Sequence, residues 1–131
     1  MNTLDDWLLG AISIVMCHTS LVREIVGRCS PEYGIYEFQL CIDGIWRSII
    51  IDDKIPIKSG SPLFCSGNKL AILLEKAYAK MRGGYENLKE GSRAAVLTEF
   101  TGGTVETIDP QVHSNLWKLI HEKIEQGYFL F

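Results

Sequence analysis

Two adjacent carboxylates open an apolar segment, in the order Asp5, Asp6 and Trp7. An aspartate is a poor nucleophile toward an amide, because the acylated product is an anhydride, although it serves as a nucleophile against better leaving groups. In the first turn of a helix, a carboxylate gains roughly 0.3–1 kcal/mol from the positive end of the helix dipole. Thr3 lies three residues earlier and gives a Thr-x-x-Asp capping pattern. The spacing therefore predicts a capping role for Asp6.

A thiol and an imidazole occur side by side at Cys17 and His18, the residue types of a nucleophile and its base. Consecutive residues of a helix point about 100° apart, so these two side chains do not face each other if the helix continues. His113 and His121 would lie about two turns apart on one helix, too far for one metal ion. We therefore interpret Cys17 as core filler and His113 and His121 as surface or interface residues.

The cysteines are separated by long gaps, at Cys17, Cys29, Cys41 and Cys65. No Cys-x-x-Cys pair occurs, so the spacing does not predict a zinc site. The first six residues carry acid before the apolar stretch, which is the wrong charge for a secretory signal. Without such a signal, reduced thiols and a cytoplasmic location are expected.

Two other patterns have simple structural explanations. Asp52 and Asp53 follow a buried-looking strand, where a strand-ending turn that keeps charge in water is preferred over a metal site. The glycine pairs 83–84 and 102–103 do not fit the Gly-x-x-x-x-Gly-Lys phosphate loop. They predict helix ends instead.

Size and composition predict one globular domain. The chain has 131 residues, of which 47% are hydrophobic and 22% charged, and its net charge is −3. Its 13 basic residues are scattered, so no basic stripe indicates nucleic-acid binding. No apolar run approaches the roughly 18 residues that span a membrane.

Hydrophobic periodicity and turn residues predict the elements that position these side chains. Alternating residues on both sides of Asp43 and Gly44 predict a β-hairpin over 34–51. The predicted helices cover 4–17, 19–27, 69–82, 92–100 and 111–126, with a loop from Cys29 to Tyr33 and a strand starting at the final Tyr-Phe-Leu-Phe. The predicted fold is α+β, helix-dominated, with one β-hairpin.

Several of these segments resemble one known family. The words DDWLLGAIS, GIYEFQL, IDDKIP, LLEKAYAK, GGYENL and EFTGG occur in the order and at about the spacing found in calpains, which are papain-like calcium-dependent cysteine endopeptidases. The chain resembles the first half of the calpain protease core, its helical subdomain, from about Asp5 to the end. The resemblance implies that residues 1–131 form a partial calpain-like catalytic domain.

The resemblance also identifies where the reaction would occur. Family members carry the nucleophilic cysteine in Gly-Asp-Cys-Trp-Leu-Leu, and the same window here, residues 4–9, reads Leu-Asp-Asp-Trp-Leu-Leu. Asp6 therefore occupies the nucleophile's position. The glutamine of the oxyanion hole would lie before Met1, and the histidine and asparagine beyond Phe131. We expect a pseudoenzyme, with little or no peptidase activity in this chain alone.

Calpains bind calcium in each subdomain, and the resemblance implies a ligand glutamate just before the LLEKAYAK helix. This chain has Asn68 there, which offers one neutral oxygen without bidentate reach. Most other ligands of that site would precede Met1. Calcium binding is therefore expected to be weak or absent, and no metal or cofactor residue is predicted.

Two functions fit these expectations. In the first, the chain is part of a calcium-dependent cysteine endopeptidase core, either truncated or completed by another polypeptide, and contributes surface for a protein substrate. In the second, it is a non-catalytic calpain-like protein-interaction module. Its partner would be a second calpain subdomain, another protein or a second copy, bound through an unusually apolar face.

Overall fold

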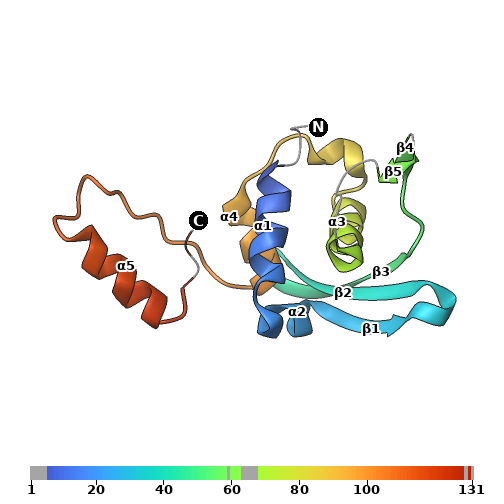
Figure 1. The fold of residues 1–131 in the computed structure, drawn as a ribbon, viewed down its shortest axis with the longest axis horizontal. Coiled ribbons are helices and arrows are strands. Elements are labelled where there is room, and N and C mark those ends of the chain that lie inside the picture. Colours follow the sequence, from blue (N-terminus) through green and yellow to red (C-terminus); the bar gives the residue numbers. More distant parts are fainter. Residues whose placement is uncertain (1–5, 59, 63–67, 129, 131) are drawn as a thin grey trace.

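The computed structural model describes residues 6–58, 60–62, 68–128 and 130. The chain forms α1 (Asp6–Met16), α2 (Thr19–Ile25), β1 (Val26–Ser30), the 3-10 turn η2 (Pro31–Tyr33), β2 (Ile35–Ile42), β3 (Ile45–Asp52), β4 (Ile57–Lys58), β5 (Ser61–Pro62), α3 (Lys69–Met81), the 3-10 turn η3 (Tyr85–Leu88), α4 (Arg93–Thr101) and α5 (Leu116–Glu125). The helices α1, α3 and α4 lie on one side of the sheet formed by β1, β2 and β3 (Figure 1). The predicted α+β class is confirmed.

The predicted first helix is confirmed as α1, within the described residues. Its core side carries Leu8, Ala11, Ile12 and Val15, all buried. These positions recur at helical spacing, so one face of α1 packs into the core while the opposite face stays open. Asp6 is exposed in the first turn, where its negative charge is attracted to the positive end of the helix dipole. Thr3, the predicted cap, lies outside the described residues.

The predicted hairpin is confirmed, with its strands paired from Ile42↔Ile45 out to Ile35↔Asp52. Asp43 and Gly44 both have positive φ, 51° and 76°, which is the backbone of a two-residue hairpin turn. Phe38 and Leu40 of β2 point into the core, both fully buried. The alternation along β2 therefore fixes which face of the sheet meets the helices.

The segment 26–30 corrects the prediction. It was expected as the end of a helix and the start of a loop, but it is β1, antiparallel to β2. Gly27 suggested a helix stop, whereas the structure places it beside the Glu37 side chain of β2. The strand forms because β2 supplies its hydrogen-bond partners, which no local signal in this short polar segment reveals. The sheet therefore has three strands, and β4 and β5 form a separate small pair.

The core is centred on α3, which matches the predicted amphipathic helix and ends at Met81. Tyr78 is fully buried and meets Phe100 of α4 edge to face, with ring centroids 5.6 Å apart. Asn68 caps the helix through a 2.9 Å bond from Leu70 N to its Oδ1. α4 runs one residue later at each end than predicted.

Two lysines of α3 protect the free edge of β3. Lys80 Nζ donates to Ile50 O at 2.6 Å, and Lys76 Nζ donates to Asp52 O at 3.0 Å. Lys76 also forms an ion pair with the Asp52 carboxylate. Charged side chains placed along an exposed strand edge block pairing with another chain.

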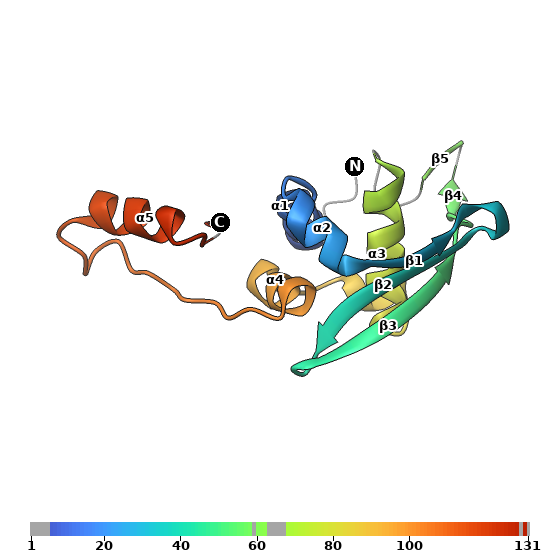
Figure 2. The same ribbon diagram turned by 90° about the horizontal axis from the view of Figure 1, so that it is seen from below.

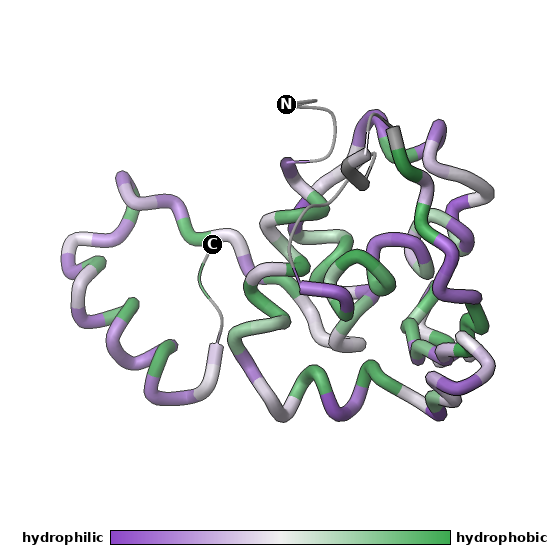
Figure 3. Tube along the Cα trace, turned by 45° about the vertical axis from the view of Figure 1, so that its right-hand side comes forward, coloured by the Kyte–Doolittle hydropathy of each residue, from purple (hydrophilic) through white to green (hydrophobic). Residues whose placement is uncertain are grey.

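The last helix also corrects the prediction, since α5 begins at Leu116 rather than at 111. Asn115 accepts a 3.3 Å bond from Lys118 N and caps α5 there, while residues 110–112 form a turn. α5 lies apart from the rest of the molecule (Figures 1 and 2). Its apolar and polar residues alternate along the tube in Figure 3, and none of its residues is buried. Of the predicted final strand, Tyr128 and Leu130 are not in a strand, and Phe129 and Phe131 lie outside the described residues.

By length and apolar character, none of the single helices in the described ranges qualifies as a membrane span. α1 and α2 pass that test only when taken together, and they are bent by 109°.

Candidate functional site

Asp6, which the family resemblance predicts at the nucleophile's position, is the first residue of α1. Asp6 is exposed, and it is the acidic residue of the first turn. The buried face of the helix begins at Leu8, so packing of that face fixes where the N-terminus of α1 points. Asp6 is therefore held at the surface by a rigid element rather than by a loop.

Trp7, the second residue of α1, packs between the core and the segment that precedes α4. Its ring meets Tyr78 edge to face, with centroids 6.2 Å apart and planes 70° apart. On its other side the ring lies against Gly91, so closely that a Cβ there would overlap the indole. The indole Nε1 is buried and has no hydrogen-bond partner among the described residues. Residue 91 must therefore be glycine if Trp7 is to keep this position, since any larger residue displaces the indole ring.

A polar cavity of about 200 Å³ lies beside Trp7. Its lining residues come from α1, from the end of α3, from η3, and from α4 and the segment before it: Trp7, Tyr78, Arg82, Asn87, Glu90, Gly91, Ser92 and Ala95. No pattern in the sequence groups the segment 90–92 with the start of α1. Only the contact between Trp7 and Gly91 identifies that segment as the second wall.

Two residues that line this cavity, Tyr78 and Arg82, are hydrogen-bonded to each other and to Glu99 of α4. Tyr78 Oη donates to Glu99 Oε2 at 2.7 Å, and Arg82 Nη2 donates to Glu99 Oε1 at 2.7 Å. Arg82 Nη2 also donates to Tyr78 Oη at 2.9 Å. Burial raises the pKa of the Tyr78 phenol, and its bond to the Glu99 carboxylate raises it further. Tyr78 therefore keeps its proton and acts as a fixed donor.

The cysteines lie away from this cavity wherever the structure describes them. Cys17 is exposed just past the other end of α1, roughly 16 Å from Asp6 by helical rise. Cys29 is exposed on β1, and Cys41 is buried on β2. Cys65 lies outside the described residues. No described thiol is therefore available to replace Asp6, and Cys17 is an exposed residue rather than the predicted core filler.

The histidines do not form a site. His18 is the N-cap residue of α2, in an extended conformation. His113 precedes α5 instead of lying on it, which corrects the prediction, and His121 lies 3.4 Å from Glu125 on that helix. Within the described residues, no group of three His, Cys, Asp or Glu side chains is arranged to hold a metal ion.

The two aspartates at the end of β3 interact with lysines. Asp52 accepts a 2.8 Å bond from Lys54 N, which makes the predicted strand-ending turn. Asp53 lies 3.7 Å from Lys69 Nζ. The hydrogen bond from Lys76, followed by that from Lys54 N, lowers the pKa of the Asp52 carboxyl. These carboxylates end the strand and pair with α3.

Asn68 does not fit the role of a calcium ligand in this conformation. Its Oδ1, the one oxygen that an asparagine side chain offers, accepts the bond that caps α3. A calcium ion there would compete with the cap for a neutral oxygen, whereas tight calcium sites use charged carboxylates.

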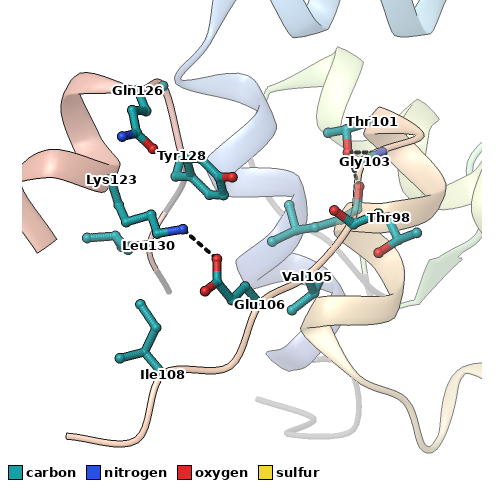
Figure 4. A pocket seen from close by; sticks show the side chains of 13 residues that line it. Thr98, Thr101, Gly103, Val105, Glu106, Ile108, Lys123, Gln126, Tyr128 and Leu130 are labelled. Atoms are coloured by element: carbon teal, nitrogen blue, oxygen red, sulfur yellow. Dashed lines mark hydrogen bonds and ion pairs between the residues drawn. The ribbon is translucent and has the colours of Figure 1, made fainter. Parts of the chain in front are cut away.

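Figure 4 shows a larger cavity, of about 370 Å³, whose lining includes neither Asp6 nor Trp7. It lies between the segment after α4 and the end of α5, with Val105 and Ile108 on one side and Tyr128 on the other. Lys123 closes it through an ion pair with Glu106, and its ammonium lies 4.4 Å from the centre of the Tyr128 ring. The smaller cavity is the better candidate site, because it adjoins the start of α1.

Comparison with known proteins agrees with the resemblance seen in the sequence. A family model described as "Calpain family cysteine protease" matches residues 2–131. The chain is 36% identical over 135 residues to the calpain-2 catalytic subunit of Gallus gallus and 37% identical to the calpain-1 catalytic subunit of Rattus norvegicus. It is 38% identical over 143 residues to the calpain-type cysteine protease DEK1 of Zea mays. Each match covers 96% of this chain, but only 19% of either calpain subunit and 6% of DEK1.

Proposed function

The chain belongs to the calpain family of cysteine proteases, and we propose that it is the helical part of an endopeptidase core that does not itself cleave peptide bonds. The observation that carries this proposal is the exposed carboxylate of Asp6 at the first residue of α1. The family motif has its nucleophilic cysteine at that position.

The proposal follows from the chemistry of the two side chains. A thiol at a helix N-terminus loses its proton readily, and the resulting thiolate attacks an amide carbonyl to form a thioester. A carboxylate at the same place is stabilised by the helix dipole, but its attack would form an anhydride, a far less stable product. Asp6 therefore supports the helix without supporting the reaction.

The cavity beside Trp7 forms a groove that does not depend on a nucleophile and is suited to binding. Its cavity is lined by side chains and by the segment 90–92, which precedes α4. We propose that a polypeptide segment, from a protein substrate or partner, lies across this groove. The free thiols of Cys17, Cys29 and Cys41 are compatible with the reducing conditions of the cytoplasm, where we propose that the chain acts.

The test restores the thiol. The Asp6→Cys chain is mixed with the second half of a related calpain core and calcium, and cleavage of a fluorogenic peptide is measured. We expect cleavage with Asp6→Cys and none with the unmodified chain. Ser13→Cys is the matched control, since it places a thiol on the exposed side of the same helix away from its start. Cleavage by the unmodified chain would refute the proposal, whereas inactivity of Asp6→Cys would favour the second candidate.

The second candidate is a protein-interaction module, favoured by the apolar face of α5. Trp117 and Ile124 are 77% and 56% exposed, and Val112 just before the helix is 74% exposed. The polar face of α5 is already satisfied by ion pairs such as Lys118–Glu122 at 3.7 Å. Exposed apolar side chains grouped in this way are typical of a surface that binds another protein.

Light scattering over a range of concentrations tests this candidate. We propose that the chain self-associates, or binds a second calpain subdomain, through α5. Trp117→Glu should abolish that association, and Lys118→Ala on the polar face should leave it intact. A chain that stays monomeric and does not bind the subdomain, with or without Trp117, would exclude the module.

A further inference from the structure

The first residue of α4 lies directly across α1. The Arg93 guanidinium packs against Gly10, where a Cβ would meet Nε at 2.6 Å and both Cζ and Nη2 at 2.9 Å. Glycine in the middle of a helix costs up to about 1 kcal/mol relative to alanine. At this position the missing side chain is what allows the guanidinium to lie flat on the helix.

This contact lies on the same side of α1 as the candidate site. Asp6 and Gly10 are four residues apart, so they share one face of the helix, about 6 Å apart along its axis. Ser13 continues this face and is exposed, whereas Leu8 and Ala11 are buried on the other. The guanidinium therefore lies one turn along α1 from the position of the family nucleophile.

Among the residues that the structure describes, the charge of Arg93 has no partner. Arg93 is exposed, and it forms no hydrogen bond or ion pair with any of the described residues, Asp6 included. Arg82, which lines the cavity, offers the contrast, since it is bound to Glu99 and Tyr78. A guanidinium has five donors in a flat fork that matches the two oxygens of a carboxylate.

We infer that Arg93 is a specificity-determining residue, which selects polypeptide segments that place an acidic side chain one turn along α1 from residue 6. The inference rests on the proposed function, because it requires a polypeptide to lie across the groove beside Trp7. The Asp or Glu carboxylate of that segment accepts two parallel hydrogen bonds from the guanidinium. Gly10 acts as a positioning residue, since any Cβ there pushes the guanidinium away.

Peptide binding to the whole chain tests the inference. The probes are short fluorescein-labelled peptides, acetylated and amidated, that differ only by Glu or Gln at one position scanned along the peptide. Fluorescence anisotropy should show about a tenfold preference for Glu at one position, since charge-assisted hydrogen bonds of this kind contribute that much or more. The preference should weaken as salt is raised.

Four variants separate the position of the charge from its presence. Arg93→Ala should abolish the preference, and Arg93→Lys should keep only part of it, because lysine lacks the fork. Gly10→Ala keeps the guanidinium but displaces it, and should also reduce the preference. Arg47→Ala, an exposed arginine on β3, is the matched control and should leave the preference unchanged. Urea unfolding of each variant checks that it is folded.

Three results would overturn the inference. If Glu and Gln peptides bind equally and Arg93→Ala has no effect, the inference fails while the groove remains a peptide site. If no peptide of either series binds, the inference and the proposed groove fail together. If, in a parallel series made without the C-terminal amide, only peptides with a free C-terminal carboxylate bind through Arg93, the site recognises a chain end and not an acidic side chain.

Discussion

Tyr78 of α3 donates a 2.7 Å hydrogen bond to Glu99 of α4, and this bond joins the two helices beside the candidate groove. The same phenol packs edge to face against Trp7, whose ring forms the groove wall. Arg82 completes the arrangement by binding both the phenol and the carboxylate. The position of Trp7 therefore depends on a polar network as well as on apolar packing.

Replacing Tyr78 by Phe should lower the free energy of unfolding by about 1–2 kcal/mol, because the bond to a charged acceptor is lost while the ring contacts remain. Urea denaturation measures the change. Glu99→Gln should cost at least as much, because it also removes the ion pair with Arg82 and leaves one acceptor oxygen where the carboxylate has two. A Tyr78→Phe chain as stable as the unmodified one would show that the bond contributes nothing.

Replacing Gly91 by Ala should move Trp7, because a Cβ at that position overlaps the indole ring. Overpacking of this kind costs about 1–3 kcal/mol. In a chain with Trp46→Phe and Trp117→Phe, Trp7 is the only tryptophan, and its emission should shift to longer wavelength. Gly103→Ala is the control, since a Cβ there meets mainly the Thr101 side chain. Unchanged emission after Gly91→Ala would contradict the contact.

The decrease in the free energy of unfolding at acidic pH should depend on Asp52. The hydrogen bond from Lys76 lowers the pKa of this carboxyl in the folded chain below the value of 3.8 that it has when unperturbed. The unfolded chain therefore takes up the proton first as the pH falls. The contribution is present above about pH 4 and is lost as the pH falls through the folded pKa.

Asp52→Asn should therefore be less stable than the unmodified chain at neutral pH, and the two should converge in acid. Urea denaturation at a series of pH values measures this difference. Asp43→Asn in the hairpin turn is the control, because Asp43 has no ion pair among the described residues and asparagine suits the same turn. A difference between Asp52→Asn and the unmodified chain that does not vary with pH would argue against the Lys76 pair.

The decrease in the free energy of unfolding at alkaline pH should depend on Tyr85. Burial, with a contribution from the Glu75 charge, raises the pKa of its phenol to about 12. The unfolded phenol loses its proton near pH 10, so this contribution is present below that value and is lost as the pH rises through about 12. Tyr85→Phe should therefore lose less stability than the unmodified chain across that window. Tyr33→Phe, at an exposed tyrosine, should not, and equal slopes for the two variants would refute the assignment.

Strong local signals made much of the fold predictable. The hairpin follows from Asp43 and Gly44 between alternating residues, and α3 follows from its apolar stripe between Asn68 and the glycine pair 83–84. The segment 26–30 was mispredicted because β1 depends on pairing with β2. The start of α5 was mispredicted because Asn115, and not Pro110, sets it.

The candidate site could be predicted only in part. Helix-start signals place Asp6 at the beginning of α1, and the structure agrees. The approach of Gly91 to Trp7 and of Arg93 to Gly10 joins residues that are far apart in the chain. Gly10 lies inside the predicted helix 4–17 and Gly91 lies between the predicted helices 69–82 and 92–100, so only tertiary packing reveals that they make room for a neighbouring side chain.

The most direct test of the account is the mass of the intact chain after incubation with a peptidyl vinyl sulfone, which alkylates a thiolate in a peptide-binding groove. The Asp6→Cys chain should gain one adduct, mapped to residue 6, faster than Cys17 or Cys29 reacts in the same sample. The unmodified chain should gain none at the groove. An adduct on a native cysteine of the unmodified chain at the same rate, or an Asp6→Cys chain that reacts no faster than its exposed thiols, would contradict the placement of Asp6 at the nucleophile's position.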